Sequence, residues 1–395
     1  MVPTRFCTIF LGAAAAMLFG GVGLAAQTKT EESKAAPSTQ ENWPIFRGDT
    51  SLSGVADGKL GSTAELAWTF QTEGPIISSP VVMDGTVYFG SSDMHVYAVA
   101  VETGEKRWAF LTDDIVDSPP LVHEGRVYFG SNDYFFYSVD AKTGELLWKY
   151  ETDDKIVGGA NWIRMPDGST RIVFGSYDTR LYCFSDKGEK LWEYMTDNFV
   201  NGTPAIIGDQ VVFGGCDAVL HFVSIATGEA VDQVPLGADC QIAGAVATTK
   251  DKVFFGHYGN AFVCIDRATG ELDWTYRSPR NPFLSSPAIG EDRIVFGGQD
   301  KLLHCAGKTD GEPLWTFPTR RKIDGSPVIC DGKVVFGSGD GRIYIVDLED
   351  GHELWQYEIG ASIFSSPAVV KGMVFIGAND DRLYAFRTLP AAPAK

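Results

Sequence analysis

The stretch "SPVVMDGTVYFGSSDMHVYAVAVETGEKRWAFLT" (residues 79–112) decides the fold. It holds four short runs of β-branched and aromatic residues, separated by Asp84-Gly85, by "SSD" and by "ETGE". Two such runs joined by Asp-Gly are typical of a β-hairpin. The stretch therefore predicts four consecutive antiparallel strands.

The same pattern recurs to the end of the chain. Its segment "YFGSSD" (88–93) has eight copies, and their glycines are Gly90, Gly130, Gly175, Gly214, Gly256, Gly297, Gly337 and Gly377. A tryptophan follows the same rhythm at Trp68, Trp108, Trp148, Trp192, Trp274, Trp315 and Trp355, whereas Asp232 stands where another is expected. A four-stranded unit with a period of about 40 residues is typical of one blade of a β-propeller. We therefore predict an all-β, eight-bladed propeller.

The phase of the tryptophans predicts how the ring closes. Trp68 precedes the first complete unit, and the last unit ends at "RLYAFRT" (382–388) with no tryptophan strand after it. We expect "AELAWTFQT" (64–72) to be the outermost strand of the last blade, because this leaves no open sheet edge. The propeller then spans residues 43–388 as one domain and leaves a tail at 389–395.

Two repeated features are predicted to be structural. Each tryptophan fills the space between neighbouring sheets, opposite a small residue: Ala98, Ser138, Cys183, Cys264, Cys305 or Ala385. The aspartate of "GSxD" is expected to bond to N–H groups of the turn. Its seven copies are Asp93, Asp133, Asp178, Asp217, Asp300, Asp340 and Asp380. Because turn geometry explains a carboxylate in every repeat, we predict no metal ring.

The N-terminus predicts export. Residues 1–25 have an early cation, an apolar run and small residues near the end, as in a cleaved secretory signal; an N-terminal membrane anchor is the alternative. Residues 26–42 form a polar linker that we expect to be disordered. No later segment is long and apolar enough to span a bilayer, so we expect a periplasmic or secreted protein. The formal net charge of −18 argues against nucleic acid or anionic lipid as partners.

Several repeats resemble a known family. "YSVDAKTGELLW" (137–148), "CIDRATGELDW" (264–274) and "IVDLEDGHELW" (345–355) are similar to the "YALDxxTGExxW" signature of pyrroloquinoline-quinone (PQQ)-type propeller repeats. "NWPIFRGDTSLSG" (42–54) resembles the segment that often precedes the first repeat in exported members. The resemblance implies two functional branches. One is the quinoprotein dehydrogenases, which hold PQQ and Ca²⁺ over the channel, and the other is the non-catalytic BamB scaffold of outer-membrane assembly.

The chain lacks the marks of an enzyme. It has no adjacent Cys-Cys pair, which the large quinoprotein alcohol dehydrogenases carry, and its six histidines fall in separate repeats without paired ligand spacing. We therefore predict no catalytic, cofactor-binding or metal residues and a BamB-like scaffold, monomeric, for protein partners in the cell envelope. The alternative is a PQQ- and calcium-dependent oxidoreductase acting on alcohols or sugars. A third possibility is a carbohydrate-binding surface, for which Phe199 and Phe283 are the candidate aromatics.

Charged loops on one face are the predicted partner-binding residues. The loops that enter the innermost strands are acidic early in the chain and basic later, so the ring should carry an acidic arc opposite a basic arc; solvated loop charge is the simpler interpretation. The acidic arc comprises Asp113, Asp114, Asp117, Asp153, Asp154 and Asp197, and the basic arc comprises Arg277, Arg280, Arg320 and Arg321.

The cysteines allow one predicted disulfide. Cys216 and Cys240 belong to neighbouring units, in loops expected on the same face, and are the candidate pair. Cys183, Cys264 and Cys305 share one repeat slot and are predicted to be small core residues.

Overall fold

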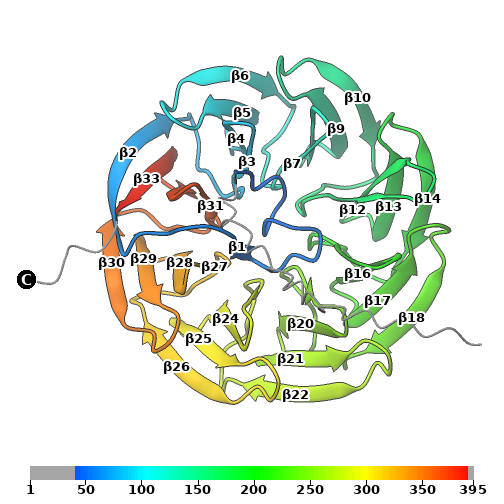
Figure 1. Cartoon of the computed structure of the whole chain (residues 1–395). Coiled ribbons are helices and arrows are strands. Elements are labelled where there is room, and N and C mark those ends of the chain that lie inside the picture. The colour runs from blue at the N-terminus through cyan, green and yellow to red at the C-terminus, as the bar shows by residue number, and fades with distance from the viewer. Residues whose placement is uncertain (1–40, 390–395) are drawn as a thin grey trace, which may run out of the picture. The chain divides into compact units, whose positions relative to one another are not determined.

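A computed structural model describes residues 41–389, and all regular secondary structure in this range is β-strand. The strands form eight sheets arranged in a ring (Figure 1), which confirms the predicted eight-bladed propeller. The predicted signal segment, all of the linker but its last two residues, and residues 390–395 of the tail lie outside the described residues. Within residues 41–389, no helix has the length and apolar character needed to cross a membrane.

Each blade runs from an innermost strand at the channel to an outermost strand at the perimeter. Blade 1 consists of β3 (Val81–Met83), β4 (Thr86–Gly90), β5 (His95–Ala100) and β6 (Lys106–Leu111), and blade 2 of β7 (Leu121–His123), β8 (Arg126–Gly130), β9 (Phe135–Asp140) and β10 (Leu146–Glu151). Blade 3 consists of β11 (Asn161–Arg164), β12 (Thr170–Gly175), β13 (Arg180–Ser185) and β14 (Lys190–Met195), and blade 4 of β15 (Ala205–Ile207), β16 (Gln210–Gly214), β17 (Val219–Ser224) and β18 (Ala230–Pro235). Blade 5 consists of β19 (Ala247–Thr248), β20 (Lys252–His257), β21 (Ala261–Asp266) and β22 (Leu272–Arg277). Blade 6 consists of β23 (Ala288–Ile289), β24 (Arg293–Gly297), β25 (Leu302–Gly307) and β26 (Pro313–Pro318). Blade 7 contains β27 (Val328–Cys330), β28 (Lys333–Gly337), β29 (Arg342–Asp347) and β30 (Glu353–Glu358).

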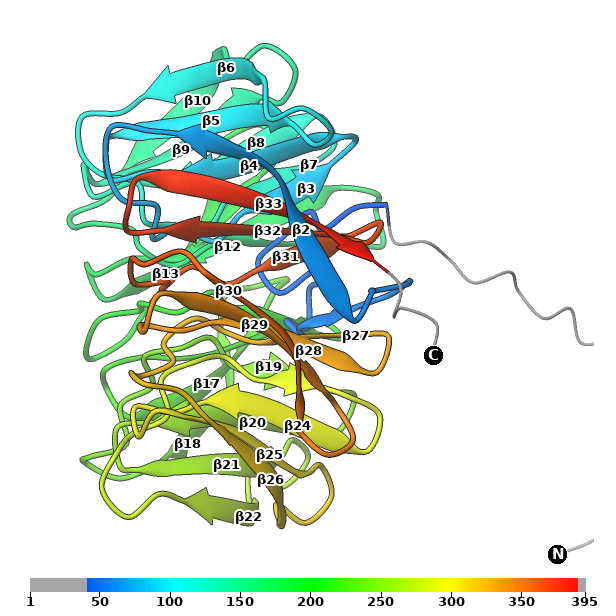
Figure 2. The ribbon, with the colours of Figure 1, turned by 90° about the vertical axis from the view of Figure 1, so that its left-hand side faces the viewer.

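Blade 8 joins the two ends of the propeller. It consists of β31 (Ala368–Val370), β32 (Met373–Ala378), β33 (Arg382–Leu389) and, outermost, β2 (Thr63–Gln71). β2 pairs antiparallel with β33, so that Leu66 lies opposite Phe386 and Gln71 opposite Arg382 (Figure 2). The predicted closure is therefore confirmed: β2 covers the edge of β33 and completes a four-stranded sheet like those of the other blades.

The tryptophans pack between blades as predicted. The Trp108 indole of blade 1 lies on the turn glycine Gly144 of blade 2, and its Nε1–H donates to the Ala141 carbonyl at 3.0 Å. The same bond to the next blade is made by Trp68, Trp148, Trp192, Trp274 and Trp315. The six small residues named above lie directly opposite these tryptophans in the strand register. This repeated junction holds neighbouring sheets together.

Replacing Gly144 with alanine is expected to destabilise the fold through this junction. A Cβ at Gly144 would lie 2.7 Å from the Trp108 ring, whereas a Cβ at Gly125, which has the same φ of +74°, would meet nothing within 4 Å. Gly125→Ala is thus the matched control for backbone strain. We expect Gly144→Ala to reduce the free energy of unfolding, measured by denaturant titration, by about 1–3 kcal/mol more than Gly125→Ala. Equal losses would show that the turn can move away from the ring at no cost.

A segment before the first blade encircles the channel at one end, a feature that the sequence analysis does not predict. We call residues 43–56 the plug segment; it loops around the centre of the ring in Figure 1 and lies at one end of the propeller in Figure 2. Its last two residues, β1 (Val55–Ala56), pair in parallel with β27 and make blade 7 five-stranded. The plug segment binds innermost strands through the backbone bonds Trp43–Val82, Pro44–Val122, Thr50–Ile206, Ser51–Thr248, Ser53–Ile289 and Gly54–Ile329.

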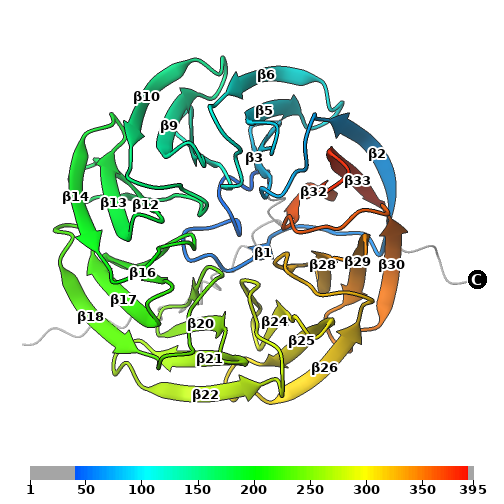
Figure 3. The ribbon, with the colours of Figure 1, turned by 180° about the vertical axis from the view of Figure 1, so that it is seen from behind.

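Arg47 fastens the plug segment to the ring. It is 1% exposed, and its guanidinium donates to the Pro287 and Pro327 carbonyls at 2.8 and 2.6 Å, where blades 6 and 7 begin. Burial lowers the pKa of Arg47 to about 9. We call this end of the propeller the plug face and the opposite end, viewed in Figure 3, the loop face.

Candidate protein-docking surface

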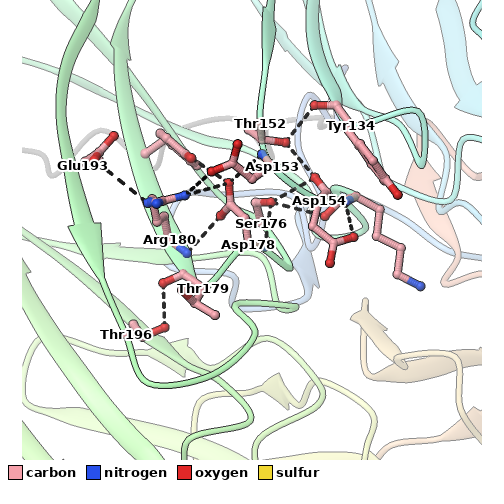
Figure 4. Close-up of polar contacts among 12 residues, drawn as sticks. Tyr134, Thr152, Asp153, Asp154, Ser176, Asp178, Thr179, Arg180, Glu193 and Thr196 are labelled. Carbon is pink, nitrogen blue, oxygen red and sulfur yellow. Dashed lines mark hydrogen bonds and ion pairs between the residues drawn. The ribbon is translucent and has the colours of Figure 1, made fainter.

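The loops between blades emerge on the loop face and are held by a repeated set of hydrogen bonds. In the loop before blade 3, Thr152 Oγ1 donates to the Tyr134 and Asp154 carbonyls, both at 2.7 Å, and the Asp153 amide donates to Asp178 Oδ2 at 3.1 Å (Figure 4). The threonine bonds recur at Thr112, Thr196 and Thr319, and the amide-to-aspartate bond recurs at Asp113 and Arg320. The loops that carry the acidic arc, and the loop with Arg320 and Arg321, are therefore held by the same set of hydrogen bonds.

The "GSxD" aspartates anchor this frame. Asp178 accepts bonds from the Arg180 amide at 3.1 Å and from the Tyr182 hydroxyl at 2.6 Å, in addition to the Asp153 amide (Figure 4). Equivalent tyrosine–aspartate pairs join Tyr97 to Asp93, Tyr137 to Asp133, Tyr344 to Asp340 and Tyr384 to Asp380. These bonds confirm that the aligned carboxylates serve the turns.

Histidine replaces the tyrosine in two blades. His221 Nε2 lies 2.8 Å from Asp217 Oδ2, and His304 Nε2 lies 3.1 Å from Asp300 Oδ1. Both imidazoles are buried, and each Nδ1 also meets a tyrosine hydroxyl, of Tyr194 and Tyr276 respectively. The sequence alone favours surface or turn positions for the histidines, but this is wrong for His221 and His304, which occupy an interior position of the repeat. It is also wrong for His123 and His257, which are buried.

The structure places the acidic arc in the loops before blades 2, 3 and 4. Asp113, Asp114 and Asp197 have exposed side chains. Asp153 is also exposed and pairs with Arg180 at 2.8 Å, and one oxygen of Asp154 accepts a bond from the Lys155 amide at 2.7 Å. Asp114 accepts the same kind of bond, from the Ile115 amide at 2.7 Å, but it is exposed whereas Asp154 is only partly so. Asp113, Asp114 and Asp197 are therefore the exposed carboxylates of the arc without an ion pair among the described residues.

Asp117 does not belong to the exposed arc. It is half-buried at the rim of the channel, where burial raises the pKa of its carboxyl. In the repeat, Asp117 follows the buried Val116, and the residues that follow the equivalent buried positions all line the channel: Ile77, Val157, Asn201, Ala243, Leu284, Asp324 and Phe364. Asp113 and Asp114, its neighbours in sequence, are exposed, but the repeat position of Asp117 faces the channel.

The basic arc lies on the later blades. Arg277 ends β22, Arg280 follows it, and Arg320 and Arg321 lie in the loop between blades 6 and 7. All four side chains are exposed, and no carboxylate in residues 41–389 forms an ion pair with them. Because the blades follow chain order around the ring, the two arcs occupy different parts of the loop face.

Exposed apolar side chains accompany the acidic arc, and sequence reasoning missed them. Leu111 and Met195 end outermost strands and are 62% and 65% exposed. Met94 and Tyr134 lie exposed at turn positions with positive φ. Other repeats have Thr179, Ala218, Asn260, Lys301, Gly341 and Asp381 at that turn position. The sequence does carry a signal for this apolar surface: at this turn position two repeats have a bulky apolar residue, whereas the others have a polar or small one.

Two further predictions need correction. Phe283 is fully buried in the apolar slot shared with Val116, so of the two candidate aromatics only Phe199 is exposed, stacked on Tyr177 at 4.8 Å. The predicted Cys216–Cys240 disulfide is not formed, and both residues are free thiols. Cys216 bonds through its amide to the Phe199 loop, whereas Cys240 Sγ faces the blade 5 turn at Gly259. The two side chains therefore meet different neighbours.

The channel mouth does not suit a quinone cofactor. The cavity there has a volume of about 200 Å³, below the range of about 300–1,000 Å³ usual for ligand pockets. Its lining includes Phe46 of the plug segment at one end and the carboxylates Asp117 and Asp324, with no cation. These carboxylates would repel PQQ, which itself carries three carboxylates. The residues present therefore do not fit PQQ, and we derive no chemistry through it.

Comparisons with known proteins agree with this architecture. A family model described as "Outer membrane protein assembly factor BamB" matches residues 32–115 and 217–390. The solved structure of BamB from Moraxella catarrhalis is similar with a TM-score of 0.68 and 16% identity, over 84% of this chain and 99% of that one.

Enzymes and a designed protein share the fold as well. A quinohemoprotein alcohol dehydrogenase from Comamonas testosteroni has a TM-score of 0.77 and 13% identity, over 91% of this chain and 82% of that one. The computationally designed Ika8 protein has a TM-score of 0.70 and 16% identity, over 83% of this chain and all of that one. Comparison with curated protein sequences gives no significant match. Likeness at such low identity concerns the fold and does not choose between the functions of these proteins.

Proposed function

Because the chain belongs to the family of PQQ-repeat propellers described as outer membrane protein assembly factor BamB, we propose that it is a non-catalytic scaffold that binds protein partners in the cell envelope. The observation that carries the proposal is the loop face of blades 1 to 4. There, exposed carboxylates and exposed apolar side chains stand together on loops fixed by hydrogen bonds. Such a mixture on a pre-organised surface suits protein recognition.

The arrangement favours a partner with basic and apolar groups side by side. Asp113 and Asp114 supply negative charge beside Leu111, which is exposed at the end of β6. Apolar contact would supply binding free energy, and the carboxylates would orient the partner. The family description suggests partners among the components that assemble outer-membrane proteins.

Charge reversal at the arc is expected to weaken partner binding. Immobilised protein would be used to capture partners from an envelope extract, and captured proteins would be identified by mass spectrometry. Asp113→Lys with Asp114→Lys should reduce capture of the main partner by at least about fivefold, since like charges oppose a basic partner. Glu105→Lys with Glu145→Lys, an equal change of charge in exposed turns of the plug face, is the control and should leave capture unchanged. Undiminished capture by the first variant would exclude the acidic arc as the docking site.

The alternative function, a quinoprotein oxidoreductase, has its own test. Purified protein would be mixed with PQQ and Ca²⁺, separated from free quinone, and assayed for dye reduction with alcohols and sugars. Because the channel mouth is small and lined by carboxylates, we expect no retained chromophore and no dye reduction. A stoichiometric chromophore with substrate-dependent reduction would replace the scaffold proposal by the enzymatic one.

A further inference from the structure

The junction between blades 4 and 5 lacks the tryptophan that fills most other junctions. At the preceding junction, the Trp192 indole lies on Gly228, with a would-be Cβ only 2.6 Å from the ring, and Nε1 donates to the Ile225 carbonyl at 3.0 Å. At blade 4 the equivalent residue is Asp232. A Cβ on the equivalent glycine, Gly270, would meet only Val234 Cγ2 at 3.1 Å and Asp232 Oδ2 at 3.6 Å. Gly270 keeps the positive φ of +67° found at the other junction glycines, but the Val234 side chain lies against it in place of a ring.

A second substitution fills part of the missing volume. Phe222 lies opposite Asp232, at the position where Cys183 lies opposite Trp192. Phe222 is 2% exposed and packs into the core with residues of blade 5, including Val253 and Ile265. The inner part of the junction is therefore closed by Phe222, and only the outer part, where an indole would reach the turn, is open.

The open part is a groove of about 500 Å³. Phe222 and Val231 form its apolar side, and Asp232 lies at its edge on blade 4. The turn Asp266–Ala268 lines it from blade 5, and the polar side chains of Gln210, Lys250 and Asp251 complete its lining. An aromatic side chain buries about 150–250 Å² on binding, and the groove has room for one.

The hydrogen-bond acceptor for an indole is also retained. Arg267 stands in the turn where Ile225, Ala141 and the other acceptor residues stand in their blades, and in the described part of the chain no donor reaches its carbonyl oxygen. The Arg267 side chain is held aside by Gln210, to whose Oε1 it donates at 3.2 Å. An apolar wall and an acceptor are therefore present in the groove, and the flat ring with an N–H donor is missing.

This chain cannot supply the ring itself. The sequence has nine tryptophans, and all lie within the described residues. Trp43 is buried in the plug segment, Trp162 stacks on His123 at 3.7 Å, and Trp355 packs on Phe386 at 5.4 Å. The other six occupy their own junctions. A folded second copy has the same tryptophans in the same places, so the ring must come from a different molecule.

We propose that the groove between blades 4 and 5 binds a tryptophan side chain of a protein partner. The inference rests on the proposed scaffold function and adds to it a specific anchor. The partner's indole lies in the groove against Phe222 and Val231, in place of the absent one, and donates its N–H to the Arg267 carbonyl. Tryptophan is favoured over phenylalanine because six junctions of the same protein show the ring and the N–H used together.

The test measures binding of N-acetyl-tryptophanamide and of a short peptide with one central tryptophan by calorimetry. Both should bind the wild-type protein, and the peptide should bind at least as tightly. The 1-methyl-indole analogue and the phenylalanine peptide should each bind about tenfold more weakly, the loss expected for one hydrogen bond of about 1.4 kcal/mol. Equal binding of the methylated analogue would overturn the assigned bond to the carbonyl, and with it the proposal.

Filling the groove provides the matched variants. Asp232→Trp with Phe222→Ser recreates the tryptophan–small pair used elsewhere and should abolish binding, whereas Asp232→Ala leaves the groove open and should bind as wild type does. If the double variant does not fold, the single change Val231→Arg, which projects a charge over the apolar wall, should lower affinity at least tenfold. Binding that survives both changes, or that admits the free amide but not the peptide, would overturn the proposal.

The result is separable from the test of the scaffold function. If reversing the charge of Asp113 and Asp114 abolishes partner capture but no tryptophan binds in the groove, the scaffold function is supported and the tryptophan site is excluded. Tryptophan-peptide binding in the groove, with capture that does not depend on Asp113 and Asp114, would support the tryptophan site and exclude the acidic arc as the docking site.

Discussion

Asp178→Ala is expected to lower the free energy of unfolding by about 3 kcal/mol, because several hydrogen bonds to one buried carboxylate are lost together. The Asp178 side chain is 2% exposed and accepts from the Tyr182 hydroxyl, the Arg180 amide and the Asp153 amide (Figure 4). Removal leaves these donors near the interior without a partner. Denaturant unfolding followed by tryptophan fluorescence measures the change.

Two control variants separate the contributions to this loss. Tyr182→Phe removes only the phenol bond and should cost about 1 kcal/mol, and Asp178→Asn keeps one acceptor oxygen and should give an intermediate loss. Hydrogen exchange at the Asp153 amide should accelerate in Asp178→Ala and stay slow in Tyr182→Phe. A loss no larger than that of Tyr182→Phe would show that the carboxylate does not hold the loop.

Raising the pH above about 10 is expected to unfold the propeller cooperatively as the buried phenols ionise. Burial, reinforced by the hydrogen bond to an aspartate, raises the pKa of Tyr344 and of Tyr384 to about 12 from the ordinary value of 10.0. The pKa values of Tyr97, Tyr137 and Tyr182 are raised for the same reasons. Since folding raises these pKa values, their stabilising contribution is complete below pH 10 and is lost as the pH rises through the folded values.

Circular dichroism and phenolate absorbance against pH would follow this transition. The two signals should change together between pH 10 and about 12, the window set by the ordinary and the folded pKa values. In Tyr344→Phe with Tyr384→Phe the unfolding free energy should depend less steeply on pH, because two linked protons are removed. Tyr134→Phe, an exposed tyrosine outside the aspartate pairs, is the control and should leave the slope unchanged. An unchanged slope in the double variant would contradict the assignment.

Much of the fold was predictable because its contacts repeat. The tryptophan, the small residue opposite it and the turn aspartate recur at fixed spacing, so one blade explains the others. The position of β2 followed from a missing tryptophan strand at the end of the chain. Even the open junction at Asp232 leaves a trace in the sequence, since tryptophan is absent there and Phe222 replaces the small residue.

What could not be predicted depends on contacts without a period. The plug segment bonds through its backbone to seven blades, and backbone bonds leave no residue pattern. Asp117 has acidic neighbours in sequence, yet its repeat slot faces the channel. Phe283 could have been placed by alignment with Val116, because both occupy the buried slot beside the preceding blade's glycine. Leu111 and Met195 end outermost strands, and the repeated tryptophans and aspartates carry no information on how exposed these two positions are.

The plug segment also constrains the order in which the molecule can be completed. Its backbone partners lie in blades 1 to 7, and β2, a few residues later, pairs with the last described strand. The plug segment can complete its bonds only after blade 7 has formed, and β2 can pair only after β33 has formed. Closing the loop between β2 and β33, which spans the whole propeller, costs conformational entropy at this last step. A chain interrupted before blade 8 would keep the partners of the plug segment but leave β2 without β33, and an unpaired strand of this kind invites association with other chains.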